Sequence, residues 1–203
     1  MHVNKLKKTI KRGDIVATDL TTLPPTRIPR TEPAKNVGII SDTHIPTRTS
    51  ALPASIFQAL ENVDYIIHAG DLVELNVIDE LEQIAPVLAV HGNMDTPTTK
   101  NILPKVNLLK IMNWSIGVTH DPSSTYGTSN LNEITKLNQF NVLIFGHTHK
   151  ASIVWEGKTL YINPGSPTDP QPHFQPKPTV AVLKVTKDTL TPRIVELESS
   201  SIP

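Results

Sequence analysis

The stretch Gly38-Ile39-Ile40-Ser41-Asp42-Thr43-His44 places an aspartate and a histidine directly after a short apolar run. The run begins at Val37 and predicts a buried β-strand over 37–41. Residues two apart on a strand share a face, so Asp42 and His44 can be directed at one ion. Carboxylate oxygen and imidazole nitrogen are common ligands of divalent metals. An Asp-x-His pair is frequent by chance. It indicates a metal site only because four later apolar runs also end in residues that can bind a metal.

These four runs lie within 63–69, 87–91, 114–119 and 141–145, and the residues that follow them are Asp71, Asn93, His120, His147 and His149. Each has an explanation without metal. Asp71 can cap a helix expected over 74–84, Asn93 can belong to a glycine-containing turn, and the histidines of Gly146-His147-Thr148-His149 can lie on the surface. Two histidines after a buried strand add nothing to a core, so that motif favours a metal role most strongly.

The alternation of strand and helix patterns predicts an α/β fold whose ligand-binding loops follow the carboxyl ends of the strands. Helices are expected over 54–62, 74–84 and 130–138, a short strand near 106–112, and a loop over 121–129. The C-terminal third predicts a hairpin over 151–162, a proline-rich loop over 163–178, and an antiparallel pair formed by 180–185 and 194–197. These hairpins suggest a second sheet packed on the first.

The composition excludes several classes of function. The chain of 203 residues has 19 basic and 19 acidic residues, so its net charge predicts no general attraction to nucleic acid or membrane. It has no cysteine, which excludes thiolate chemistry and leaves oxygen and nitrogen ligands for a metal. No apolar stretch reaches the ~18 residues of a membrane span, and no secretory signal is visible. We therefore expect a cytoplasmic protein without specific nucleic-acid or membrane binding.

Residues 1–36 have a different composition from the rest, with more basic than acidic residues and four prolines between positions 24 and 33. This composition predicts an extended or partly disordered arm. The arm can attract phosphate or join subunits, but we favour a solvated extension without chemistry. The predicted domain covers 37–198, and 199–203 form a tail.

The candidate ligands are too many for one four-coordinate ion; they are Asp42, His44, Asp71, Asn93, His120, His147 and His149. They suit two divalent ions about 3.5–4 Å apart that share a carboxylate, an arrangement that clamps an in-line displacement at phosphorus. A water between two such ions loses a proton near neutral pH and becomes the nucleophile. No protein nucleophile is then needed, in agreement with the missing cysteine.

In order along the chain, the motif series resembles that of the calcineurin-like metallophosphoesterases: Asp42-x-His44, Gly70-Asp71, Gly92-Asn93-x-Asp95, His120 and Gly146-His147-x-His149. The small single-domain phosphodiesterases are the more similar branch, through Ser41-Asp42-Thr43-His44, His68-Ala69-Gly70-Asp71, Gly146-His147-Thr148-His149 and Ile162-Asn163-Pro164-Gly165-Ser166. The resemblance covers residues 37–198 and leaves the arm outside.

The resemblance implies a four-layer α/β/β/α sandwich of two mixed β-sheets flanked by helices. It implies one ion held by Asp42, His44, Asp71 and His149, and a second held by Asp71, Asn93, His120 and His147, with Asp71 bridging. Mn²⁺ is the expected metal, with Ni²⁺, Fe or Zn²⁺ as variants. The implied activity is phosphodiester hydrolysis by a metal-bridging hydroxide, with Asp71, Asn93, Asp95 and His120 in catalytic roles, Asp95 from outside the ligand set.

Two positions depart from the resembled pattern. Met94 stands where many larger relatives have a histidine proposed to protonate the leaving group, and a thioether cannot donate a proton. General acid help is worth ~10²–10⁴-fold, so we expect aryl or nucleotidyl diesters to be preferred over esters with basic alkoxide leaving groups. Asp121-Pro122 replaces the usual Gly-His after His120, and its carboxylate adds negative charge that can weaken binding of a multiply charged phosphate.

Two other functions stay open at this stage. One is a non-catalytic protein-interaction scaffold on the same fold, like the retromer subunit of this family, but no expected ligand position is missing here. The other is a single-metal hydrolase of another type. The expected partner is a small phosphodiester substrate, and relatives of this size suggest a homodimer.

Overall fold

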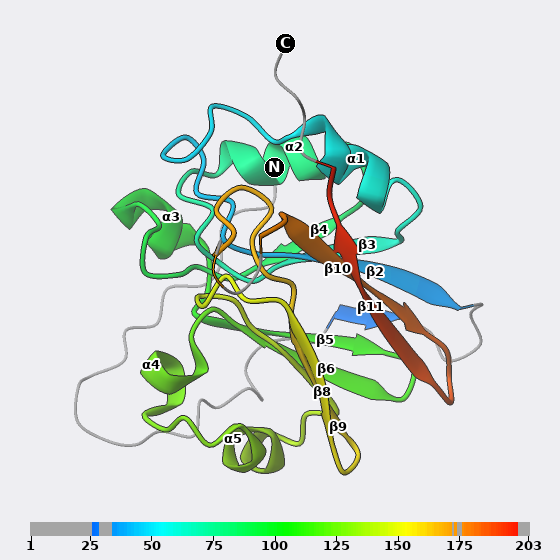
Figure 1. Ribbon diagram of the computed structural model, residues 1–203. Coiled ribbons are helices and arrows are strands. Elements are labelled where there is room, and N and C mark those ends of the chain that lie inside the picture. The colour runs from blue at the N-terminus through cyan, green and yellow to red at the C-terminus, as the bar shows by residue number, and fades with distance from the viewer. Residues whose placement is uncertain (1–25, 29–33, 172, 174–175, 199–203) are drawn as a thin grey trace.

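The fold is described from a computed structural model, for residues 26–28, 34–171, 173 and 176–198. Within these residues two β-sheets pack face to face, and helices cover the outer face of each sheet (Figure 1). Helices α1 (Ala54–Leu60) and α2 (Asn76–Leu81) lie over the smaller sheet, while α4 (Pro122–Tyr126) and α5 (Leu131–Asn138) lie on the side of the larger one. The predicted four-layer α/β/β/α sandwich is confirmed.

Both sheets are mixed. Across the larger sheet the described strands are β1 (Thr26–Ile28), β5 (Val106–Ile111), β6 (Trp114–Thr119), β7 (Val142–Ile144), β9 (Thr159–Asn163) and β8 (Ser152–Glu156). Across the smaller sheet they are β11 (Leu190–Glu196), β10 (Thr179–Val185), β2 (Lys35–Ile40), β3 (Tyr65–His68) and β4 (Val87–Ala89). Strands β2, β3 and β4 are parallel, as are β6, β7 and β9.

The two C-terminal hairpins do not build a sheet of their own, contrary to the prediction. The first hairpin joins the larger sheet, because β9 pairs in parallel with β7. The second joins the smaller sheet, because β10 pairs antiparallel with β2. Hairpin patterns determine local pairing only, whereas the sheet that each hairpin extends depends on contacts with strands far away in the chain.

Two helices were not predicted. Residues 121–129 were expected to be a loop, but α4 begins at Pro122 after Asp121, whose carboxylate accepts a hydrogen bond from the Ser123 backbone N–H at 2.9 Å. Gly127 ends it in the left-handed conformation, with φ 70°. An Asp cap, a first-turn proline and a terminal glycine are helix boundary signals that the loop interpretation overlooked. Helix α3 (Pro97–Ile102) begins in a similar way, with Thr96 as the capping residue and a proline directly after it.

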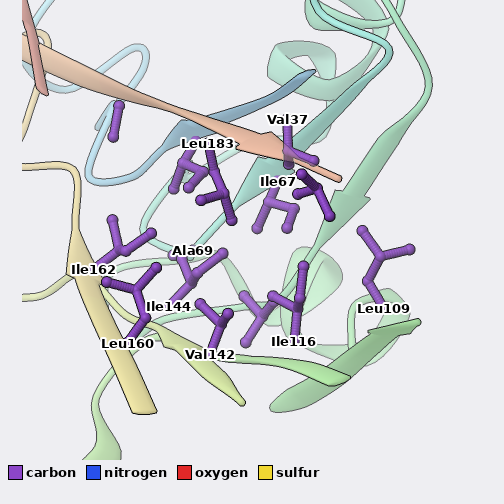
Figure 2. Close-up of a cluster of buried hydrophobic side chains, with 14 of the residues drawn as sticks. Val37, Ile67, Ala69, Leu109, Ile116, Val142, Ile144, Leu160, Ile162 and Leu183 are labelled. Atoms are coloured by element: carbon purple, nitrogen blue, oxygen red, sulfur yellow. The ribbon is translucent and has the colours of Figure 1, made fainter. Parts of the chain in front are cut away.

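The main core lies between the two sheets (Figure 2). Val37 and Ile39 of β2 meet Val142 and Ile144 of β7 there, all without exposed surface. A second cluster packs α1 and α2 onto the smaller sheet, and a third packs α5 onto the larger one. Truncating one such large apolar side chain to alanine lowers the free energy of unfolding by about 2–5 kcal/mol. The strands are therefore packed firmly, and this packing fixes the strand ends that carry the candidate ligands.

Within the predicted arm, residues 1–36, the structure describes β1 and residues 34–36, of which Lys35 and Asn36 begin β2. β1 pairs in parallel with β5 at the edge of the larger sheet. The rest of the predicted arm before Thr26, together with the tail 199–203, lies outside the described residues. In the described part of the chain, no helix has the length and apolar character needed to cross a membrane.

Candidate metal centre

The candidate ligands meet at one edge of the sandwich, where strands of both sheets end. Asp42 and His44 follow β2, Asp71 follows β3, His120 follows β6, and the other two histidines follow β7. Most of these residues have a positive φ, which non-glycine residues rarely adopt; they are Asp42, His44, Asp71, His147 and His149. Such backbone strain persists only where the surroundings enforce it, and it gathers at functional sites.

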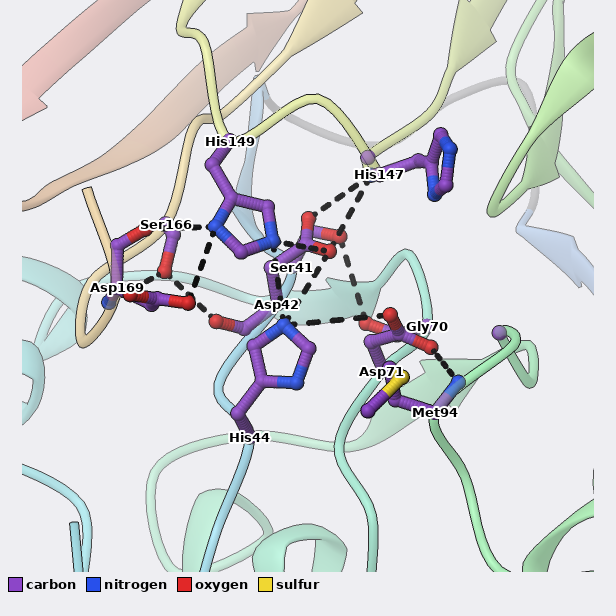
Figure 3. A network of polar contacts seen from close by, with 12 residues as sticks. Ser41, Asp42, His44, Gly70, Asp71, Met94, His147, His149, Ser166 and Asp169 are labelled. Atoms are coloured by element: carbon purple, nitrogen blue, oxygen red, sulfur yellow. Dashed lines mark hydrogen bonds and ion pairs between the residues drawn. The ribbon is translucent and has the colours of Figure 1, made fainter. Parts of the chain in front are cut away.

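One group of donors surrounds Asp42 (Figure 3). The Nε2 atom of His149 lies 3.3 Å from Asp42 Oδ1 and 3.2 Å from His44 Nε2. The Nε2 atom of His44 lies 4.0 Å from Asp71 Oδ2. The donors predicted for the first ion are therefore together.

A second group surrounds His120, whose Nε2 atom lies 3.2 Å from Asp71 Oδ2 and 3.1 Å from Asn93 Oδ1. The same Asn93 oxygen lies 3.1 Å from His147 Nδ1. The donors predicted for the second ion are also together, and both groups include or touch Asp71 Oδ2.

The two groups differ in burial. Asp42, His44 and His149 are 0%, 5% and 9% exposed, whereas Asn93 and His147 are exposed at the surface. The first group, which we call the closed half, is thus shut off from solvent. The second, the open half, is reached from outside past Asn93 and His147.

Hydrogen bonds on the far side of two imidazole rings fix which nitrogen faces the centre. His120 Nδ1 lies 2.9 Å from the carbonyl oxygen of Ala69, and His149 Nδ1 lies 2.6 Å from that of Asp169. A carbonyl can only accept, so each Nδ1 donates, and each neutral ring presents a lone pair at Nε2. Rings held in this way are typical of metal-binding histidines.

Asp95, predicted as catalytic, lies outside the ligand group. Its carboxylate accepts hydrogen bonds from the backbone N–H groups of Gly92 at 2.6 Å, Val73 at 2.5 Å and Asp71 at 3.2 Å. Both carboxylate oxygens of Asp95 accept hydrogen bonds, so this side chain connects the loop of Asp71 to the turn of Gly92. The geometry gives Asp95 a positioning role.

The segment 166–169 supports the closed half, and no role was predicted for it. Ser166 Oγ donates to the Asp42 carbonyl at 2.7 Å and accepts from the Asp169 N–H at 2.8 Å. Asp169 in turn holds His149, and its carboxylate accepts from Arg48 Nε at 2.8 Å. Ser166 lies in the motif Ile162-Asn163-Pro164-Gly165-Ser166 that carries the resemblance, and its place in that motif was the signal available in the sequence.

His68, within the same motif as Asp71, supports the turn without facing the donors. Its Nδ1 accepts from the Gly70 backbone N–H at 3.2 Å, and its Nε2 lies 3.1 Å from Thr43 Oγ1. Complete burial lowers the pKa of His68 to about 4. The ring is therefore neutral at pH 7 and has a structural role.

The donors at the centre perturb one another's protonation. Burial alone would lower the pKa of His120, but the hydrogen bond to Asp71 and the charges of Asp42 and Asp71 raise it to about 9. Burial opposes ionisation of Asp71 as well, yet its contact with His120 lowers the pKa of this carboxyl group. Without a cation, protons therefore balance the carboxylates, and a bound metal would take over that function.

The donor set fits divalent cations. The His149 Nε2 lone pair converges with Asp42 Oδ1 and His44 Nε2, and Asn93 Oδ1 points at two ring nitrogens. Groups that only accept repel one another at about 3 Å unless a proton or cation lies between them. The oxygen and nitrogen chemistry suits Mn²⁺, Fe, Ni²⁺ or Zn²⁺.

The chain is similar to known proteins in sequence and in fold. The sequence model of the calcineurin-like phosphoesterase superfamily domain matches residues 36–188. The chain is 38% identical over 160 residues to a probable metallophosphoesterase of Methanothermobacter thermautotrophicus, covering 78% of this chain and 91% of that protein. It is 36% identical over 139 residues to a phosphodiesterase of Methanocaldococcus jannaschii, covering 64% and 82%.

Among solved structures, vacuolar protein sorting 29 from Cryptosporidium parvum is similar with a TM-score of 0.66 and 19% sequence identity. The match covers 82% of this chain and 99% of that one. At this identity the likeness concerns the fold alone.

Proposed function

The chain belongs to the calcineurin-like phosphoesterase superfamily, and from that premise we propose that it is a phosphodiesterase with a dinuclear metal centre. The family and the donor set support a metal-dependent phosphoesterase. The choice of diesters is supported by the similarity to the M. jannaschii phosphodiesterase. The two-ion centre is supported by two groups of possible metal ligands, one of Asp42, His44 and His149 and one of Asp42, Asp71 and His120, which share Asp42 and which Asp71 Oδ2 also connects through His44 and His120.

The position of Asp71 Oδ2 carries the proposal. This oxygen lies 3.2 Å from His120 Nε2 in the open half and 4.0 Å from His44 Nε2 in the closed half. The other oxygen, Oδ1, accepts from the Met94 backbone N–H at 2.7 Å. Asp42 Oδ1 also lies near ring nitrogens of both halves, 4.0 Å from His120 Nε2 and 3.3 Å from His149 Nε2. However, both Asp42 oxygens already accept from the His147 backbone N–H, at 3.3 Å and 3.0 Å. Asp71 is therefore our choice for the shared ligand.

In this proposal one ion is held by Asp42, His44, Asp71 and His149, and the other by Asp71, Asn93, His120 and His147. When bound, such a pair of cations supplies an activated water and offsets the charge of the phosphate. The residues of the chain hold the donors in place. Ala69 and Asp169 orient the rings of His120 and His149, and Asp95 fixes the loops that carry Asp71 and Asn93.

Hydrolysis of bis-p-nitrophenyl phosphate by the full chain tests the proposal. After removal of metal with a chelator, we expect no turnover, recovery with Mn²⁺, and slower hydrolysis of the monoester p-nitrophenyl phosphate. Metal analysis should give two ions per chain, whereas one ion would support a single-metal hydrolase. No metal-dependent turnover of either ester would refute the enzyme.

A protein-interaction scaffold is the second candidate, because vacuolar protein sorting 29 shares this fold. The scaffold predicts a stable protein complex and no hydrolysis in the same assay. Manganese as the metal, a cytoplasmic location and a homodimer also belong to the proposal. Metal analysis of the protein from its native host and sedimentation of the purified chain test the first and the last.

A further inference from the structure

Four exposed residues border the open half of the centre. Asp42, His44 and Asp71 are at most 5% exposed, whereas Asn93, Met94, His147 and Thr148 are exposed. A substrate that reaches the open half therefore passes these four residues. Three of them are polar, and Met94 is the apolar one.

Met94 is held beside the shared carboxylate. Its backbone N–H donates to Asp71 Oδ1 at 2.7 Å (Figure 3). Met94 is nevertheless 55% exposed, in contrast to Gly92 and Asp95, the buried residues that flank Asn93 and Met94. An exposed apolar side chain fixed at the mouth of a polar site gains hydrophobic stabilisation when a ligand covers it.

A positive charge lies next to Met94. Lys100 Nζ donates to the backbone carbonyl of Asn93 at 2.7 Å, one residue before Met94. A phosphodiester combines one negative charge with two ester groups that can be apolar. The ammonium group and the thioether together match that combination, because the first attracts the anion and the second can contact an ester group.

We propose that Met94 is a specificity-determining residue that contacts an aromatic group next to phosphorus, so that the site selects phosphodiesters with an aromatic ester group. This inference rests on the proposed function. Methionine sulfur makes favourable contacts with aromatic rings, and its unbranched side chain adapts to their shape. Such a contact raises affinity for an aromatic over a methyl group by about 2- to 10-fold.

Binding measurements with two probes test the contact. The affinities of phenylphosphonate and methylphosphonate for the Mn²⁺-loaded full chain are measured by calorimetry in wild type, Met94→Ala, Met94→Gln and Met94→Leu. We expect the ratio of affinities to fall about 2- to 10-fold in Met94→Ala and Met94→Gln, and to fall by less in Met94→Leu, which keeps an apolar contact but lacks the sulfur. Leu137→Ala, an exposed apolar residue of α5 on the outer layer, is the control and should keep the wild-type ratio.

A second measurement reads the contact directly. The chain has three methionines, so ¹³C-methyl labelling of methionine gives a simple spectrum in which the Met94 signal is the one lost in Met94→Leu. In the chain loaded with diamagnetic Zn²⁺, because Mn²⁺ would broaden a signal so close to it, phenylphosphonate should shift this signal by its ring current, and methylphosphonate should not. An unchanged affinity ratio in Met94→Ala, or a Met94 signal that does not respond to the ring, would overturn the inference. Failure of hydrolysis would instead refute the proposed function.

Discussion

The closed and open halves of the centre use the same donor chemistry but are built differently. The closed half is buried, and its ring and backbone groups are held by the segment 166–169. In the open half, Asn93 and His147 are exposed and contact each other through a single oxygen–nitrogen pair of 3.1 Å. The difference teaches that the fold itself fixes one half, while the other half is left accessible to substrate.

The largest expected effect on activity comes from substituting Asp71, whose carboxylate lies next to both halves. Asp71→Asn keeps an oxygen for the Met94 N–H but removes the charge that both halves use. Loss of an orienting group outside the ligand set already costs 10- to 100-fold, so we expect kcat for bis-p-nitrophenyl phosphate to fall at least about 100-fold. The control is Asp188→Asn, on an exposed turn, which should retain full activity. Equal activity of the two variants would contradict the shared role.

The free energy of unfolding should fall more after a substitution in the closed half than after one in the open half. In the metal-free chain, His149→Ala removes a buried ring that donates to Asp169, and we expect a loss of about 1–3 kcal/mol of unfolding free energy. His147→Ala removes an exposed ring, and we expect a change within about 0.5 kcal/mol. Urea unfolding of both variants measures the difference. Similar losses would show that the halves are not built differently.

A pH series tests a buried support of the closed half, because His68 contacts Thr43, the residue between Asp42 and His44. Its pKa is lowered from 6.5 to about 4, so above pH 6.5 it is neutral in both states and its contribution to stability is complete. As the pH falls from 6.5 towards 4, the unfolded chain binds a proton that the folded chain does not, and stability decreases. Denaturant unfolding should show less of this decrease in His68→Gln, which keeps a donor for Thr43.

The smallest expected effect concerns charge at the edge of the open half. Asp121→Asn keeps a good helix cap for α4 but removes a carboxylate that interacts with His147. We expect unchanged unfolding free energy and a relative gain of about two- to fivefold in kcat/KM for a monoester dianion over a diester. A ratio equal to that of wild type would show that Asp121 acts only as a cap.

Much of the fold was predictable because it depends on local patterns. The strands that end at Asp42, Asp71, His120 and His147 are short apolar runs, and periodicity alone located them. Helix α4 was missed although Asp121, Pro122 and Gly127 carry its boundary signals, since proline and glycine also mark loops. The sheet that each hairpin joins was assigned wrongly, because that choice depends on distant strands.

The sequence by itself determined which chemistry is available: carboxylate, amide and imidazole donors at five strand ends, and no thiol. Only the tertiary structure decided how they are grouped and which of them are buried. His44 and His149, whose Nε2 atoms lie 3.2 Å apart, are 105 residues apart in the chain. Ligand type is a property of single residues, whereas distance, burial and the supporting bonds of Ser166 and Asp169 arise when two sheets pack together.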